Sequence, residues 1–133
     1  MASMPEGHHT INPYLTCQNA ASAIGFYKTV FGAEELERIV EDDGRIGHAT
    51  LQIGNSRLML SDEHLEINVP SPKTLGGTPV GMIIYVEDAD VTASRAVEAG
   101  MKVIRPVATQ GNGLRLGIFE CPYGHRWFIS SFI

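Results

Sequence analysis

The chain has 133 residues, of which 44% are apolar and 19% are charged. This length fits one ordinary domain, and the composition is typical of a globular protein with its own core. The 15 acidic residues outnumber the 10 basic ones, giving a formal net charge of −5. That balance argues against nucleic acid and against an anionic membrane surface as partners, because both bind clustered Lys and Arg.

The first residues and the cysteines indicate a cellular context. Residues 1–9 are polar and contain no apolar core of a secretory signal, so we expect them to form a disordered tail. No run of about 18 apolar residues occurs, and the sequence therefore predicts no membrane span. Cys17 and Cys121 do not make a disulfide framework. Two reduced thiols predict a cytoplasmic protein.

Residues 10–61 predict a first module in the order strand, helix, strand, strand, strand. Asn19 has the side chain of an N-cap, and Gly32 suits the left-handed residue that ends a helix. Between them, apolar side chains recur at the spacing of one buried helix face. Turn-forming residues then separate three strand-like runs, at 36–40, 46–53 and 57–60.

Residues 62–79 predict a linker, and residues 80–133 repeat the first module. The linker contains three prolines and a Gly-Gly pair, and we expect such a long loop to border the binding site. In the second module Asp88 and Gly100 bound the helix, 69 and 68 residues after their counterparts Asn19 and Gly32. Strand-like runs follow at 102–108, 114–119 and 126–129. The sequence therefore predicts an internal repeat.

Several short motifs connect this repeat to a known family. The motifs are Ala23-Ile-Gly-Phe-Tyr27, Val30-Phe-Gly-Ala33, the run 47–54 and Pro122-Tyr-Gly-His-Arg-Trp127. A doubled βαβββ unit with these motifs resembles the vicinal oxygen chelate superfamily. It resembles in particular its PhnB-like branch of glyoxalases, bleomycin resistance proteins and dioxygenases. The resemblance implies one α+β domain, in which two tandem βαβββ modules form a curved mixed-sheet cup.

The resemblance also implies where a metal would bind. Metal-dependent members of the superfamily use four ligands, from the first and last strand of each module. These positions are Asn12, Met59, Gly81 and Phe128. A thioether or a phenyl ring cannot serve a hard divalent ion, and glycine offers no side chain. We therefore expect no metal and no other cofactor. Of the scattered remaining ligands His48 is the best, and none forms a pair with the spacing of a metal motif.

The alternation of side chains along strands predicts which residues line the cup. We expect a mixed apolar and polar pocket. Its predicted lining is Asn12, Tyr14, Thr16, His48, Thr50, Gln52, Met59, Ile83, Tyr85, Arg115, Arg126 and Phe128.

Some of these side chains have two readings each. His48 is the candidate catalytic acid or base, or else a partly buried histidine that bonds across the sheet. Arg115 could hold a carboxylate or phosphate, or be a solvated edge arginine. The aromatic side chains and Met59 could stack on a flat ligand or fill the cup without one.

Three functional hypotheses remain open from the sequence. The first is a metal-free protein that binds a small molecule, in the manner of bleomycin resistance proteins. The second is a lyase, isomerase or dioxygenase of the same superfamily that uses His48 or an unusual metal site. The third is a scaffold with a vestigial cup. We also expect a homodimer, because the apolar strands need covering and a two-fold dimer is the commonest solution.

Overall fold

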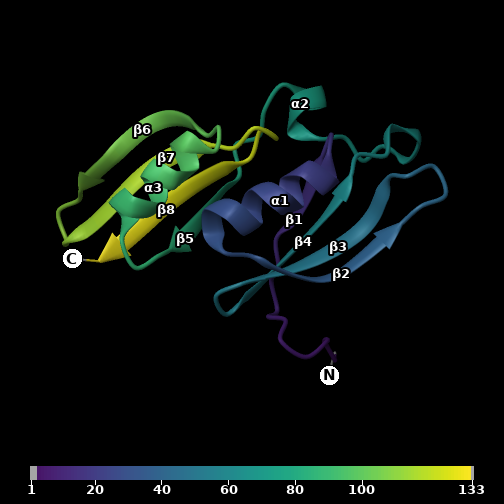
Figure 1. Ribbon diagram of the computed structural model, residues 1–133, viewed down its shortest axis with the longest axis horizontal. Helices are drawn as coiled ribbons and strands as arrows, with labels where there is room; N and C mark the ends of the chain where they lie inside the picture. The colour runs from purple at the N-terminus through teal and green to yellow at the C-terminus, as the bar shows by residue number, and fades with distance from the viewer. Residues whose placement is uncertain (1–2, 133) are drawn as a thin grey trace. The chain divides into compact units, whose positions relative to one another are not determined.

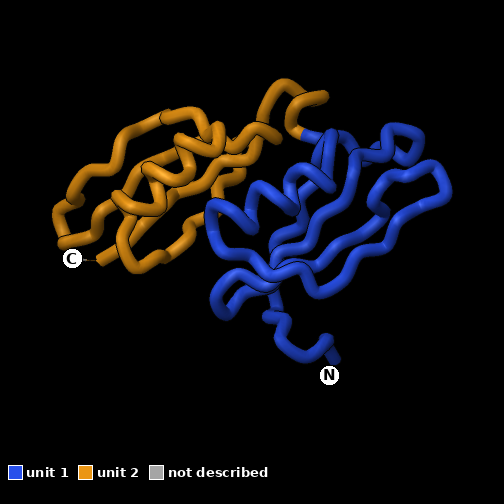
Figure 2. Tube along the Cα trace, viewed as in Figure 1, with its two compact units in different colours: residues 1–71 blue, residues 72–133 orange. Residues whose placement is uncertain are grey.

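The computed structural model describes residues 3–132. The chain divides into two compact units, residues 1–71 and 72–133 (Figure 2). Each unit holds one four-stranded mixed sheet and one long helix, which confirms the α+β class and the tandem modules. The expected linker at 62–79 is divided between the two units and is not a separate segment.

The sheet of the first unit has the strand order β1-β4-β3-β2 (Figure 1). Its strands are β1 (Tyr14–Cys17), β2 (Glu34–Val40), β3 (Ile46–Ile53) and β4 (Ser56–Asp62). Strand β1 runs parallel to β4, and the other neighbours are antiparallel. The bounds of β3 agree with the sequence prediction, whereas β2 and β4 are each longer than predicted.

Helix α1 (Ala20–Phe31) forms as its sequence predicts. The Asn19 side chain accepts a hydrogen bond from the Ser22 backbone N–H at 3.1 Å, which satisfies one orphan donor of the first turn. Gly32 ends the helix in the left-handed region, with φ of 68°. The face that carries Ala23, Tyr27 and Val30 is fully buried against the sheet.

The second unit repeats this architecture with the strand order β5-β8-β7-β6. Its elements are β5 (Gly81–Tyr85), α3 (Ala89–Glu98), β6 (Lys102–Thr109), β7 (Leu114–Glu120) and β8 (Arg126–Phe132). Asp88 caps α3, as predicted, by accepting from the backbone N–H groups of the next turn. Trp127, Phe119 and Ile129 are buried in the core of this unit.

Two short helical segments lie within the expected linker. A 3-10 turn, η1 (Leu65–Ile67), follows β4, and the one-turn helix α2 (Pro72–Leu75) opens the second unit. The described part of the N-terminal segment also differs from the expected free tail. Arg57 donates hydrogen bonds to the backbone oxygens of Glu6 and Gly7, and a His9 ring nitrogen contacts the Asn55 oxygen. These contacts hold the segment on the β3–β4 hairpin.

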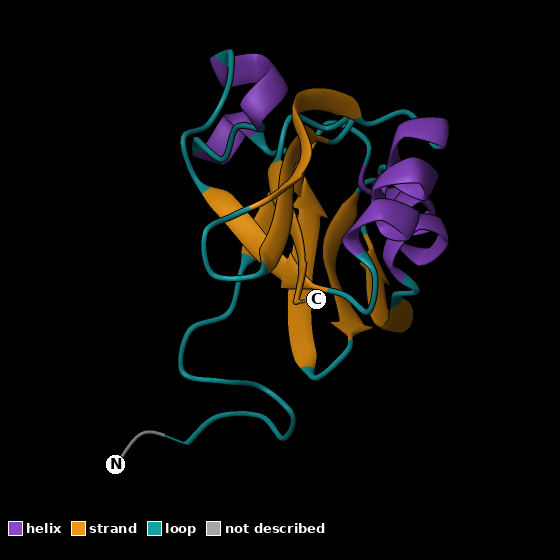
Figure 3. Ribbon diagram, turned by 90° about the vertical axis from the view of Figure 1, so that its left-hand side faces the viewer, coloured by secondary structure: helices purple, strands orange, loops and turns teal. Residues whose placement is uncertain are grey.

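In each unit the long helix packs on one face of the sheet and leaves the other face without a helix (Figures 1 and 3). We call the latter the helix-free face. Burial follows this division along β1, where Leu15 and Cys17 are buried and Tyr14 is 47% exposed. The same division along β5 leaves Ile83 and Tyr85 exposed. The helix-free faces carry most of the predicted site residues.

Candidate functional site

A chain of three polar side chains crosses the helix-free face of the first unit. The Tyr14 hydroxyl lies 3.1 Å from His48 Nδ1, and His48 Nε2 lies 3.0 Å from the Thr50 hydroxyl. Tyr14 belongs to β1, whereas His48 and Thr50 belong to β3. Strand β4 lies between them and places Met59 opposite both Tyr14 and Thr50. The sequence prediction had named all four side chains, and the structure brings them together.

The exposed fraction of these three hydrogen-bonded side chains increases from Thr50 to Tyr14. Thr50 is buried, with 6% of its surface exposed, while Tyr14 at the other end is 47% exposed. His48 is half-buried between them, and its ring is tilted by 37° against that of Tyr14. Of these three side chains Tyr14 is therefore the one that a ligand can reach. His48 and Thr50 hold its hydroxyl from the more buried side.

Other predicted residues of the first unit are engaged locally. Asn12 lies before β1, and its side-chain amide both accepts from and donates to the His9 backbone. The Gln52 amide donates to the Gly54 oxygen at the hairpin turn. Thr16 is half-buried on β1, opposite Ser61. Ser61, on the same face, was missed by the sequence prediction, which ended the strand one residue earlier.

The helix-free face of the second unit is apolar and aromatic. Ile83 is opposite Phe128, and the rings of Tyr85 and Phe132 stack with centroids 6.1 Å apart. Arg126 begins β8 on the same face, at the position opposite Gly81. Phe132 was absent from the predicted set because the predicted strand ended at residue 129. This face offers apolar contact area, but its described residues form no hydrogen-bonded set of side chains like that of Tyr14, His48 and Thr50 in the first unit.

Arg115 does not lie on the helix-free face, and that prediction is wrong. Its guanidinium forms a bidentate ion pair with Asp90 of α3, at 2.8 and 2.9 Å, so it lies on the face that carries the helix. The pair lowers the pKa of the Asp90 carboxyl, chiefly through these hydrogen bonds. Arg115 thus fastens α3 to β7, and its guanidinium is engaged with the protein's own carboxylate.

The four positions of the superfamily metal site do not suit a divalent cation. The Asn12 amide is engaged with the backbone of His9, and Met59 offers only a thioether. In the second unit the Phe128 ring occupies the space above Gly81, where any Cβ would collide with it. The donor set therefore lacks the carboxylates and imidazoles that such ions require. Among residues 3–132, no group of three or more His, Cys, Asp or Glu side chains is arranged to hold a metal.

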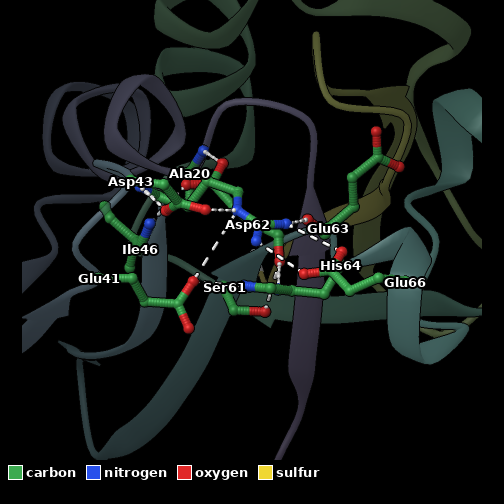
Figure 4. Close-up of polar contacts among 10 residues, drawn as sticks. Ala20, Glu41, Asp43, Ile46, Ser61, Asp62, Glu63, His64 and Glu66 are labelled. Atoms are coloured by element: carbon green, nitrogen blue, oxygen red, sulfur yellow. Dashed lines mark hydrogen bonds and ion pairs between the residues drawn. The ribbon is translucent and has the colours of Figure 1, made fainter.

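A second polar cluster surrounds the end of β4 (Figure 4). The carboxylate of Asp62 accepts hydrogen bonds from the Ala20 N–H at 2.8 Å and the Ile46 N–H at 2.7 Å. It thereby joins the start of α1 to the start of β3. The Ser131 hydroxyl, 69 residues later, accepts from the Ala89 N–H in the same way at 2.9 Å. This position of the repeat is a structural tie in both units.

His64 and Arg45 complete this second cluster. The two ring nitrogens of His64 face the Asp62 carbonyl at 2.8 Å and the Glu41 carboxylate at 2.7 Å, and the Glu41 contact raises the pKa of His64. Arg45 is paired with Asp43 and Glu66, and this pairing lowers the pKa of Glu66 to about 2. Arg45, Asp43 and Glu66, which are paired with one another, line a hollow of about 570 Å³, whereas His64 and Glu41 lie outside its lining. No spacing in the sequence signalled this cluster.

The family model described as Glyoxalase/Bleomycin resistance protein/Dioxygenase superfamily matches residues 7–129. The chain belongs to this superfamily, the vicinal oxygen chelate class that its repeated fold defines. Uncharacterized protein Rv0887c of Mycobacterium tuberculosis is 38% identical over 124 residues, covering 91% of this chain and 73% of that protein.

Solved structures show the same fold at lower identity. The PhnB protein from Bacillus cereus has a TM-score of 0.73 at 18% identity, covering 92% of this chain and 99% of that chain. The fosfomycin resistance protein FosX from Listeria monocytogenes, complexed with Mn(II) and sulfate, has a TM-score of 0.72 at 14% identity. That likeness covers 98% of this chain and 93% of the FosX chain. Within the described residues of our protein, no helix is long and apolar enough to cross a membrane.

Proposed function

We propose that this chain binds a small molecule on the helix-free face of its first unit, without a divalent metal. The observation that carries the proposal is the hydrogen-bonded chain of Tyr14, His48 and Thr50 beside the thioether of Met59. Small-molecule sites combine apolar surface with a few placed polar groups in this way. Taken by itself, the second unit also carries an aromatic surface, the stacked rings of Tyr85 and Phe132, of the kind that contacts flat ligands.

The internal repeat supports a functional reading of these polar groups. The register of the second unit places Ile83, Leu116 and Ile118 at the positions that correspond to Tyr14, His48 and Thr50. The same sheet face is therefore built from three apolar side chains in one unit and from three hydrogen-bonding ones in the other. The second unit forms the same fold with apolar side chains at these three positions. The fold therefore does not by itself require the hydrogen-bonding side chains of the first unit.

Ligand binding can be tested by a thermal-shift screen of aromatic compounds, glycopeptides and thiols. A ligand at 100 times its Kd should raise the free energy of unfolding by about 2.7 kcal/mol. The Met59→Glu variant, which places a charge in the middle of the face, should lose the response while keeping its fold by circular dichroism. Absence of a response to every class would favour the scaffold hypothesis.

The metal-free part of the proposal has its own experiment. Protein purified without a chelating resin is analysed for metal, before and after incubation with Ni, Zn, Mn and Fe. We expect less than one equivalent of each, because the four superfamily positions offer no suitable donor set. Stoichiometric metal that is lost in His48→Ala and kept in the control His8→Ala would contradict the proposal.

An enzyme of the same superfamily is the second candidate, and the contacts of His48 favour it. Histidine is the side chain that most often moves a proton to or from a substrate, and His48 is held in place here by the Tyr14 and Thr50 hydroxyls. This candidate predicts that ligands found in the screen are converted, and that conversion stops in His48→Gln while binding remains. Recovery of every bound ligand unchanged would leave the binding function alone.

A further inference from the structure

We infer that Tyr14 is the group that meets the ligand, and that it donates a hydrogen bond to an anionic oxygen of an aromatic compound. His48 and Thr50 act as positioning residues that set the direction of this donation. The inference deepens the proposed binding function and rests on it. It is carried by the order of donors and acceptors along the three side chains.

Thr50, the buried member of the three side chains, determines which group donates each hydrogen bond. A neutral imidazole has one donor nitrogen and one acceptor nitrogen. The Thr50 hydroxyl is buried, and within residues 3–132 its hydrogen-bonding partner is His48 Nε2. A buried hydroxyl whose proton finds no acceptor is costly, so Thr50 donates to Nε2. His48 then carries its proton on Nδ1 and donates it to the Tyr14 oxygen.

This order leaves the proton of the Tyr14 hydroxyl pointing away from His48. Because Tyr14 is 47% exposed, that proton is available to a bound molecule. The Tyr14 oxygen also accepts from Nδ1, and a hydroxyl that accepts one hydrogen bond becomes a stronger donor of the next. The face therefore offers a directed donor, whose natural partner is an oxygen with high electron density.

The charges nearby favour an anion. Arg57 precedes Met59 by two residues on β4, so its side chain emerges on the same face. Among the described residues Arg57 bonds backbone carbonyls and pairs with no carboxylate, so its positive charge is not neutralised by an ion pair. Glu37 lies opposite Thr50, but it is exposed on the outer strand β2, where water screens its charge.

The apolar surroundings favour an aromatic ring on that anion. Met59 occupies the position between Tyr14 and Thr50, and a thioether makes favourable contacts with the edges and faces of aromatic rings. A phenolate or an aromatic carboxylate would place its oxygen at the Tyr14 hydroxyl and its ring over Met59. Such a compound matches both the donor and the apolar patch.

The direction of hydrogen-bond donation from Thr50 through His48 to Tyr14 can be measured without any ligand. Two-bond ¹H–¹⁵N correlation spectra of histidine side chains report which ring nitrogen carries the proton. We expect His48 to carry it on Nδ1 in the wild type and on Nε2 in Thr50→Val, which removes the donor but keeps the shape. A wild-type His48 protonated on Nε2 would overturn the inference whatever the protein binds.

The ligand class is tested with 4-nitrophenol and its methyl ether, 4-nitroanisole, at a pH where the phenol is ionised. We expect the wild type to bind both compounds and to prefer the phenolate. Tyr14→Phe should weaken phenolate binding by about 10-fold or more, the effect of one hydrogen bond to a charged group, and leave the ether unaffected. Thr50→Val should reduce the same preference, and the control Tyr123→Phe should change neither compound.

The outcomes separate this inference from the proposal beneath it. If both compounds bind and Tyr14→Phe weakens them equally or not at all, the inference is wrong and the binding function stands. If neither compound binds the wild type while other classes respond in the thermal screen, the aromatic anion is the wrong class. If nothing binds in either experiment, both the inference and the proposed function fail.

Discussion

Asp62 joins two elements of the first unit through one carboxylate. It accepts from the Ala20 and Ile46 backbone N–H groups, and its removal would leave both donors without that partner. We predict that Asp62→Ala lowers the free energy of unfolding by about 2–4 kcal/mol, from two hydrogen bonds to a charged group. Ser131→Ala, which removes the single neutral bond at the equivalent position, should cost about 1 kcal/mol. Urea unfolding of both variants measures the difference, and equal losses would contradict it.

His64 predicts a pH dependence of stability. Both of its ring nitrogens face oxygen acceptors, so the doubly protonated ring satisfies both contacts and the pKa of His64 is raised in the folded state. A raised pKa contributes stability that is fully present below the unfolded value of about 6.5 and is lost as pH rises through the folded value.

Urea unfolding from pH 5.5 to pH 8.5 tests this prediction, because the range runs from about one unit below to about two units above an ordinary histidine pKa of about 6.5. The wild type should lose more stability with rising pH across that range than His64→Gln does. His8→Gln, in the N-terminal segment, serves as the control and should follow the wild type. Parallel curves for wild type and His64→Gln would show that protonation of His64 does not stabilise the folded state.

At the scale of elements, two glycines, one inside helix α1 and one at its C-terminal end, have opposite predicted effects. Gly32 has a φ of 68°, a conformation that costs a residue with a Cβ about 1 kcal/mol, whereas Gly25 lies inside the helix. A Cβ at Gly25 would meet no atom within 4 Å. We predict that Gly25→Ala stabilises the protein by about 0.5–1 kcal/mol and that Gly32→Ala destabilises it by about 1 kcal/mol. The midpoint of urea unfolding should move in opposite directions in the two variants.

Local signals predicted the elements well, because caps, helix-ending glycines and apolar periodicity act within a few residues. Asn19, Gly32 and Asp88 all have the predicted roles. The face of β7 was not predicted, because it depends on register. Ala49 and Gly117 occupy equivalent positions beside Leu60 and Ile129. The sequence prediction had instead aligned Arg115 with His48, and a slip of one residue moves a side chain to the opposite face.

The candidate site was predictable as a list of residues and not as an arrangement. Alternation along β1 and β3 identified Tyr14, His48 and Thr50, because each is adjacent in sequence to an apolar residue that is buried against the helix. Their hydrogen bonds depend on how far β1 and β3 stand apart across β4, which no local pattern encodes. The cluster of His64, Glu41 and Arg45 depends likewise on a loop that returns to the β2–β3 hairpin.

At the scale of the whole molecule, the unpaired edges of the two sheets and the exposed apolar side chains predict self-association. Strands β1, β2, β5 and β6 are the outer strands of their own sheets. Within the described residues Ile83, Tyr85 and Phe132 are each at least 60% exposed. Edge strands and apolar patches are usually covered, and a two-fold dimer is the commonest assembly that covers them.

We therefore predict a homodimer with twice the 14.5 kDa mass of the chain. Size-exclusion chromatography with light scattering at micromolar concentration measures this mass directly. Dilution should shift the peak toward the monomer, because a dimer dissociates by mass action, and added ligand should reverse the shift if it binds only the assembled form. The replacement of Phe132 by Ser removes exposed apolar surface without touching the core, so its elution reports whether this side chain takes part. A single species of 14.5 kDa at all concentrations would show that the outer strands and apolar residues remain uncovered.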